Sequence, residues 1–183
     1  AGIGRRLKEF QRECLLGLGV DVIYWTFDPL VARNAHLNLN RLGAEVVEYV
    51  SDMYGDSNSV LHNGLGTDRF VVAWKIRSQG PVAASGFDAS DHDRAPVVNG
   101  TDHDDGWPLQ DGRAAAMPAS LRVEIPRDIH QVRAASPEAA AEWRSSTRDA
   151  FLATLGRGYR IVGVYRDGAT DRCYYVLSKP EPA

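Results

Sequence analysis

Hydrophobic residues recur with a helical period in three stretches of the chain. In the first, apolar positions three and four residues apart line one face between residue 3 and the glycines Gly17 and Gly19: Ile3, Leu7, Phe10, Cys14 and Leu18. The second runs from Asp28, which can cap a helix, to Gly43. The third begins at Ser136-Pro137-Glu138, a capping residue with proline in the first turn, and ends at Gly156. Each pattern predicts an amphipathic helix.

Runs of β-branched and aromatic residues between these helices have the length of strands. They predict strands over residues 20–25, 45–50, 69–76, 121–125, 159–165 and 173–177. The Asp167-Gly168 pair predicts a turn that makes the last two strands a hairpin. The order of helices and strands therefore predicts an α/β fold.

Residues 78–120 carry no sustained period and are rich in proline, glycine and aspartate, which is typical of a flexible linker. They divide the chain into an N-terminal part over 1–77 and a C-terminal α/β part over 121–183, which is a strand, a helix and a β-hairpin. No internal repeat at a fixed period is visible in the sequence.

The composition narrows the classes of protein to which this chain can belong. Hydrophobic residues make up 44% and charged residues 25%, as in ordinary soluble domains, and no apolar run reaches the roughly 20 residues of a membrane span. A net charge of −3 without a basic block argues against nucleic-acid binding. The two cysteines, Cys14 and Cys173, stand in apolar settings and predict buried thiols and a cytoplasmic location.

Candidate metal ligands are confined to the linker. Asp91-His92-Asp93 and the acidic run at 102–105 offer oxygen and imidazole donors, but their spacing matches no metal motif. We therefore expect no bound metal.

The first helix begins with Gly2-Ile3-Gly4-Arg5, where free backbone N–H groups and the helix dipole favour an anion. Glycine at this position lets a ligand approach the backbone. The alternative is that the two glycines only make a tight entry turn.

This start, followed by helix, strand, helix ending in Leu-Gly, strand and strand, resembles the C-terminal half of the GNAT superfamily of acyltransferases. Gly2-Ile3-Gly4 are similar to the last three positions of its pyrophosphate-binding pattern. The stretch from Tyr24 to Ala44, together with Val123-Glu124-Ile125-Pro126 and Trp143-Arg144-x-x-Thr147-Arg148, resembles one branch of predicted N-acyltransferases. Some members of that branch are associated with N-acylamino acid racemases.

The resemblance implies an acyl-CoA, acetyl-CoA or succinyl-CoA, as co-substrate and a small amine or amino acid as acceptor. The acyl group would pass directly to the amine without a covalent enzyme intermediate. The superfamily's N-terminal half has no counterpart in this chain, so we expect a fragment that is inactive by itself. The expected partners are the small amine or amino acid and a second copy of this chain, with which it would form a homodimer. The rival hypothesis is a non-catalytic ligand-binding or interaction module on the same half-fold.

Many superfamily members carry a tyrosine four residues before the Leu-Gly glycine, as the acid for the departing thiolate, and Leu39 stands at that position here. Tyr54 is the remaining candidate for a catalytic acid, provided that its loop folds back. The alternative for Tyr54 is a packing residue with a solvated hydroxyl.

Asn34 and Asn38 lie one turn apart on the second helix, and their amides are candidates for binding the pantetheine of the cofactor, with a solvated helix face as the alternative. Trp25 and Arg33 are expected near the acceptor cleft, where an arginine suits a carboxylate. The alternative for Arg33, which the sequence favours, is a plain surface arginine.

Arg144 and Arg148 are also one turn apart and need a negative partner between them. A substrate carboxylate would satisfy both arginines. The alternative is pairing with Glu142, Asp149 or Glu124.

Overall fold

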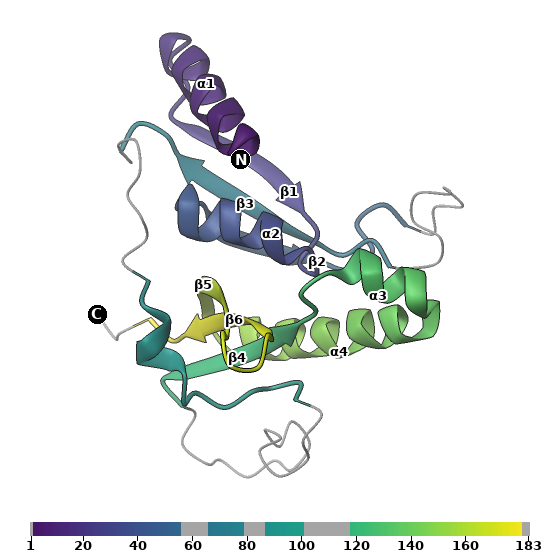
Figure 1. Ribbon diagram of the computed structural model, residues 1–183. Helices are drawn as coiled ribbons and strands as arrows, with labels where there is room; N and C mark the ends of the chain where they lie inside the picture. The colour runs from purple at the N-terminus through teal and green to yellow at the C-terminus, as the bar shows by residue number, and fades with distance from the viewer. Residues whose placement is uncertain (1, 56–65, 79–86, 101–117, 181–183) are drawn as a thin grey trace.

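The structure, a computed structural model, describes residues 2–55, 66–78, 87–100 and 118–180. In these residues the chain is a mixed α/β protein with two three-stranded antiparallel sheets (Figure 1). Within the same ranges, every helix is too short or too polar to cross a membrane.

The N-terminal elements form the first sheet. They are α1 (Ile3–Gly17), β1 (Val22–Phe27), α2 (Ala32–Ala35), the π-helical turn η1 (His36–Arg41), β2 (Glu45–Val50) and β3 (Arg69–Lys75). The strands lie in the order β1-β3-β2, with β3 antiparallel to both neighbours. The predicted order of helix, strand, helix, strand and strand is confirmed, with boundaries shifted by at most two residues for the strands.

The C-terminal elements form the second sheet. After the short 3-10 helix η2 (Ala89–His92) come β4 (Ser120–Ile125), α3 (Ile129–Ala135), α4 (Pro137–Leu155), β5 (Arg160–Arg166) and β6 (Cys173–Ser178). The strand order is β4-β6-β5. The predicted cap of α4 is confirmed, because Ser136 Oγ accepts a hydrogen bond from the Ala139 amide at 3.1 Å. Helix α3 was not predicted, although Asp128 caps it through the amides of His130 and Gln131.

The two sheets have the same topology. In each, a strand is followed by a helical segment and two further strands, the last strand lies in the middle, and the second strand carries a bulge. The middle strands β3 and β6 read as almost continuous apolar runs because neighbours flank them on both edges and packed elements cover them. The duplication lies in the topology, and the side chains of the two halves differ too much for a repeat to be visible in the sequence.

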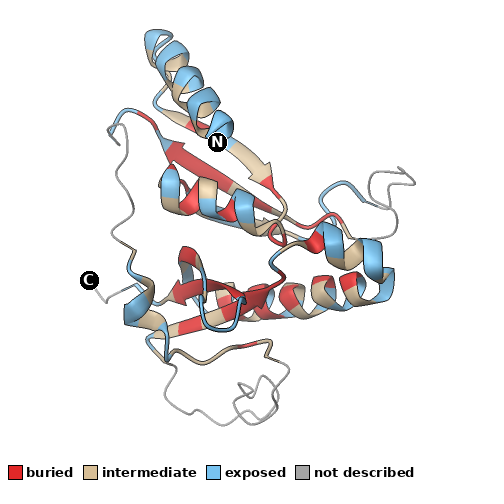
Figure 2. Ribbon diagram, viewed as in Figure 1, coloured by how far each residue is buried: buried red, intermediate tan, exposed pale blue. Residues whose placement is uncertain are grey.

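One hydrophobic core joins the two sheets (Figure 2). Its centre is an aromatic cluster of Tyr49, Phe70, Phe151 and Tyr175, in which the Phe70 and Phe151 ring centroids are 4.9 Å apart and those of Phe70 and Tyr175 are 5.6 Å apart. Rings at these distances and tilts stabilise one another beyond the burial of their area. The N- and C-terminal parts therefore share a core.

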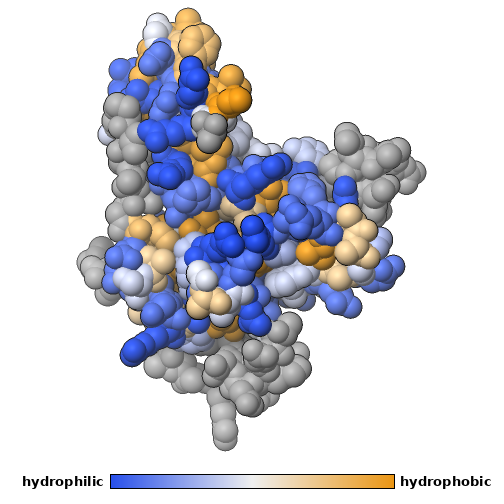
Figure 3. All heavy atoms as spheres, in the orientation of Figure 1, coloured by the Kyte–Doolittle hydropathy of each residue, from blue (hydrophilic) through white to orange (hydrophobic). Residues whose placement is uncertain are grey.

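Helix α1 does not bury its apolar stripe. Ile3, Leu7 and Phe10 are 76%, 68% and 64% exposed, and no residue of the helix is buried. Figure 3 shows the hydrophobic residues at the α1 end of the molecule on the surface. The prediction of a buried thiol is consequently wrong for Cys14, which is exposed, and confirmed for Cys173.

The second helix is shorter and wider than predicted. Pro29 is buried and its carbonyl accepts a hydrogen bond from the Tyr175 hydroxyl at 2.8 Å, so the helix begins only at Ala32. From His36 the turns widen into η1, which brings the Asn40 side chain to the edge of β5. There the Asn40 amide donates to the Val164 carbonyl at 2.8 Å and accepts from the Val164 amide at 3.1 Å.

Part of the predicted linker packs against the second sheet. Val97 forms a parallel bridge with Arg122 of β4, and the Asn99 side chain makes two hydrogen bonds of 2.8 and 2.9 Å with the backbone of Glu124. The Phe87 ring lies where a side chain on Gly163 would stand. Residues 79–86 and 101–117 of the predicted linker lie outside the described residues.

Replacing Phe151 with alanine should lower the free energy of unfolding by about 3–5 kcal/mol, because the ring is fully buried in the shared cluster. The neighbouring Leu152 is 51% exposed, so Leu152→Ala is the matched control and should cost less than about 1 kcal/mol. Urea unfolding followed by circular dichroism measures both. Equal losses would show that the cluster does not hold the sheets together.

Candidate functional site

The N-terminal end of α1 has the features of an anion-binding site. Gly2 adopts a left-handed backbone conformation with a φ of 99°, and no side chain caps the helix. The first turn contains no acidic residue but carries Arg5 and Arg6. The Arg5 guanidinium is 2.7 Å from a carboxylate oxygen of Glu9, so Arg6 is the less engaged of the two cations. Free N–H groups, the positive end of the helix dipole and two arginines coincide at this end.

This end of α1 passes close to the second helix. A side-chain carbon added to Gly4 would stand 3.3 Å from Leu37 Cδ2. Asn34 lies three residues before Leu37, hence on the same side of its helix, and is exposed. Asn38 is buried, and its backbone carbonyl accepts a hydrogen bond from the Ala44 amide at 2.9 Å. The two asparagines therefore differ in exposure: of this pair, only Asn34 has its side-chain amide on the surface.

Trp25, predicted near the acceptor, packs between α1 and β3. Its ring meets Trp74 edge-on with the centroids 6.2 Å apart, and Lys8 Nζ lies 3.9 Å from the Trp25 centroid. Burial lowers the pKa of Lys8 from its ordinary value. The contact fixes α1 alongside β1 by a cation–π interaction.

Tyr54 lies next to the end of β1, because the loop after β2 folds back. Its hydroxyl is 3.3 Å from Thr26 Oγ1, and its ring is 5.2 Å from the Arg69 guanidinium. The Tyr54 amide donates to Thr67 Oγ1 at 3.0 Å, which anchors the loop, while the side chain remains 53% exposed. The structure therefore places a solvent-accessible phenol beside the Trp25-Thr26 segment, where an acceptor was expected.

Arg33 points elsewhere. With Arg127 and Asp128 it lines a cavity of about 60 Å³ beside the start of α3. Arg33 therefore lies against the C-terminal half of the chain.

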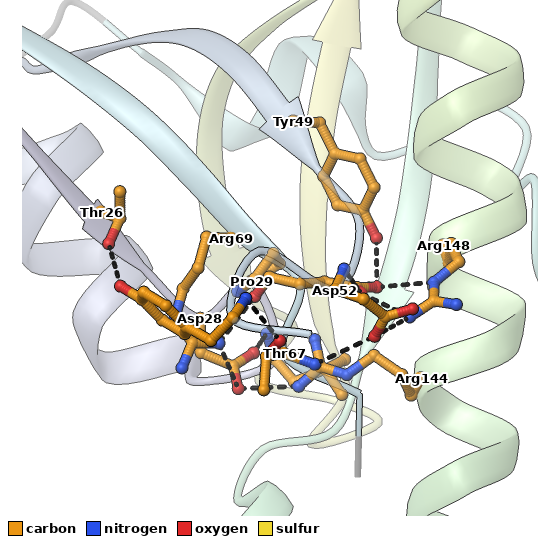
Figure 4. A network of polar contacts seen from close by, with 12 residues as sticks. Thr26, Asp28, Pro29, Tyr49, Asp52, Thr67, Arg69, Arg144 and Arg148 are labelled. Carbon is orange, nitrogen blue, oxygen red and sulfur yellow. Dashed lines mark hydrogen bonds and ion pairs between the residues drawn. The ribbon is translucent and has the colours of Figure 1, made fainter. Parts of the chain in front are cut away.

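Arg144 and Arg148 belong to a network that joins α4 to two loops of the N-terminal half, the one after β1 and the one between β2 and β3 (Figure 4). Arg144 Nη2 donates to Asp28 Oδ2 at 2.7 Å. Arg148 donates to both carboxylate oxygens of Asp68, at 2.5 and 3.0 Å, and to Asp52 at 2.8 Å. The predicted partners Glu142, Asp149 and Glu124 are wrong, because the carboxylates come from segments distant in the sequence. These aspartates already supply the negative charge that the two arginines require.

Asp68 is the buried centre of the network, with a fully buried side chain. Burial by itself would raise its pKa, but hydrogen bonds from Arg148, the Tyr49 hydroxyl and the Asp52 amide outweigh burial, and the pKa is lowered from its ordinary value. Burial, together with the hydrogen bond to Asp68, raises the pKa of Tyr49 far above its ordinary value. The carboxylate is therefore ionised and the phenol neutral at physiological pH.

Sequence reasoning did not pair Arg144 and Arg148 with the three aspartates, although each aspartate stands beside a strand end; Asp28 was expected only to cap a helix. Asp28 follows β1, Asp52 follows β2 and Asp68 precedes β3. A charged residue next to a buried strand is a usable signal, but it does not identify the partner. In the described ranges, no three histidine, cysteine or acidic side chains are grouped as metal ligands.

Comparison of the chain with protein-family models, with curated proteins and with solved structures finds no match.

Asp68→Asn should lower the free energy of unfolding at pH 7 by about 3–5 kcal/mol, because Arg148 loses its buried counter-charge. The pKa of Asp68 is lower in the folded state, so its contribution is fully present above the unfolded value of about 3.9 and is lost as the pH falls through the folded value. The difference between wild type and variant should therefore narrow below about pH 4.

Denaturant unfolding between pH 3 and pH 7 tests this pH dependence. Asp149→Asn is the control, since Asp149 is adjacent to Arg148 in sequence but exposed, and it should leave stability nearly unchanged. A pH-independent deficit for Asp68→Asn would contradict the assignment of the low pKa.

Proposed function

We propose that this protein is an acyl-CoA-dependent N-acyltransferase that binds the diphosphate of coenzyme A at the N-terminal end of α1. The observation that carries the proposal is this helix start, with a left-handed Gly2, no capping side chain and no acidic residue in the first turn. A diphosphate would satisfy the free N–H groups there. The sequence resemblance to the GNAT superfamily and the order of elements from α1 to β3 support the same assignment.

The acceptor would be a small amine, such as an amino acid. Its nitrogen attacks the thioester carbonyl carbon, so that a C–N bond forms, the C–S bond breaks and the thiolate leaves. The amine loses one proton and the thiolate gains one, which gives an amide and a free thiol. Binding both substrates in one orientation supplies much of the rate, and no covalent enzyme intermediate is required.

Tyr54 is the proposed proton donor for the thiolate. Its hydroxyl lies 3.3 Å from Thr26 Oγ1 at the end of β1 and is open to solvent, so it can both reach a substrate and be reprotonated. The Arg69 guanidinium lies 5.2 Å from the centre of the Tyr54 ring. Asn34 would contact the pantetheine arm from the second helix.

A non-catalytic binding module is the second candidate function. The exposed apolar stripe of α1 favours it, because such a surface fits contact with another macromolecule. The two functions differ in one measurement on the full-length protein: an acyltransferase releases free thiol from acetyl-CoA in the presence of an amine, and a binding module does not.

Gly4→Asp should weaken coenzyme A binding at least about tenfold in calorimetry, because it places a carboxylate where the diphosphate would meet the helix amides. Gly17→Asp is the matched control, since it makes the same change at the opposite end of α1, where a side chain meets nothing within 4 Å. Pantetheine, which lacks the diphosphate, should bind both variants alike. Unchanged coenzyme A affinity in Gly4→Asp would remove the proposed site.

Tyr54→Phe should reduce thiol release by about a hundredfold while leaving coenzyme A affinity unchanged, because it removes only the ionisable hydroxyl. Tyr24→Phe is the control, an equally conservative change at a tyrosine of β1 that is 64% exposed. If both variants keep the wild-type rate, the acid must be another group.

A further inference from the structure

Helix α1 packs on the first sheet mainly with its polar side. Lys8 Nζ lies 3.9 Å from the centre of the Trp25 ring, and Arg12 Nε donates to the Ile76 carbonyl at 2.9 Å. The last turn adds apolar contacts with the core through residues 15–16. An amphipathic helix normally turns its apolar stripe toward its own core. Because α1 does the reverse, its stripe is available to a partner.

The exposed stripe of α1 has the spacing of a coiled-coil seam. Ile3, Leu7, Phe10 and Cys14 follow one another at intervals of four, three and four residues, and all four are exposed. Positions a and d of a heptad alternate in this way, so that side chains of one helix fit between those of another. Figure 1 shows α1 at the end of the molecule farthest from the second sheet. A second helix can therefore lie along the stripe without meeting that sheet.

The stripe is complementary to itself when two copies of α1 run antiparallel. Its outer positions, Ile3 and Cys14, then meet each other across the pair, and its inner positions, Leu7 and Phe10, do the same. Each of the four side chains is thereby covered by one from the other copy. The antiparallel arrangement also brings the positive end of each helix dipole near the negative end of the other.

The charges beside the stripe favour the antiparallel orientation. Arg6 and Glu13 border the same side of the stripe, both are exposed, and neither makes an ion pair within the described residues. In an antiparallel pair, Arg6 of each copy faces Glu13 of the other, which gives two ion pairs by symmetry. On the other side Gly4 faces Gln11, which sets no like charges together. In a parallel pair Arg6 would face Gln11, and Glu13 would face Leu18.

We propose that two copies of this chain associate through their α1 helices as an antiparallel, two-fold symmetric pair. The four apolar positions form the seam, and the pairs between Arg6 and Glu13 select the orientation. A helix of 15 residues gives a small interface, which is typical of weak and reversible complexes. We expect a dimer Kd between about 1 and 100 µM.

Sedimentation velocity of the full chain, without coenzyme A and up to about 500 µM, measures this equilibrium. Leu7→Lys should raise the dimer Kd at least about tenfold, because it places an ammonium group against Phe10 of the second copy. Leu7 is 68% exposed, so the fold should tolerate the change, and circular dichroism checks it. Leu152→Lys is the matched control, the same substitution at a leucine of α4 that is 51% exposed. It should leave the dimer Kd unchanged.

A charge exchange tests the pairing of Arg6 with Glu13. Arg6→Glu alone should raise the dimer Kd about fivefold or more, because two carboxylates then face each other in each ion-pair position. Glu13→Arg alone should do the same with two guanidinium groups. The double variant, with both changes in one chain, should return to the wild-type Kd, since opposite charges face each other again.

Disulfide formation tests the orientation. With oxidised glutathione as the oxidant, Ile3→Cys should form a disulfide-linked dimer, because the introduced thiol meets Cys14 of the second copy. The wild-type chain should not, since the two Cys14 residues of an antiparallel pair lie about 16 Å apart along the helices. Cys173 is buried and does not take part. The control is Ile3→Cys with Cys14→Ser, which should stay unlinked. Non-reducing electrophoresis measures all three.

Four results would overturn the proposal. A chain that stays monomeric at about 500 µM would leave the stripe to a different partner. Equal weakening by Leu152→Lys would place the interface elsewhere, and failure of the double charge exchange to restore the Kd would remove the pairing. A disulfide in the wild type but not in Ile3→Cys would show parallel helices. Arg6 borders both the seam and the proposed diphosphate site, so dimerisation is measured without coenzyme A and can fail separately from the acyltransferase proposal.

Discussion

The arrangement of the two sheets depends on the buried carboxylate of Asp68. A charge with no exposure must be paired, and Arg148, on a helix from the other half of the chain, provides the counter-charge with two hydrogen bonds. Tyr49 donates to the same carboxylate at 2.5 Å while its ring packs on Phe151. The ion pair and the aromatic core thereby share Tyr49, and both join α4 to the first sheet.

The four outer strands of the two sheets differ in what covers their outer edges. Residues 96–99 cover β4, and Asn40 occupies part of β5. In the described part of the chain, β1 and β2 have no such cover. The proposed cofactor site, at the N-terminal end of α1, lies beside β1. The middle strand β3, held by the core and by Asp68, fixes both edges relative to each other.

Local sequence patterns were sufficient for most of the helices and strands. The alternation in β2, the apolar runs of β3 and β6 and the Ser136-Pro137 start of α4 are short-range signals that depend on the residue's own neighbours. Local patterns did not predict the correct start and width of the second helix. The Pro29 carbonyl accepts a hydrogen bond from Tyr175, which is distant in sequence, and the wider turns of η1 bring Asn40 to β5. Tertiary contacts there outweigh local preference.

For the site, the sequence by itself determined the glycine-flanked start of α1, since a helix N-terminus is a property of consecutive residues. It also identified Arg144 and Arg148 as a pair in need of negative charge. Only the tertiary structure decided that Asp28, Asp52 and Asp68 supply it, that Asn38 is buried while Asn34 is exposed, and that the α1 stripe is left uncovered. Spacing along a helix fixes which side chains share a face, whereas the partner of that face is set by segments whose separation in sequence carries no information about their distance in space.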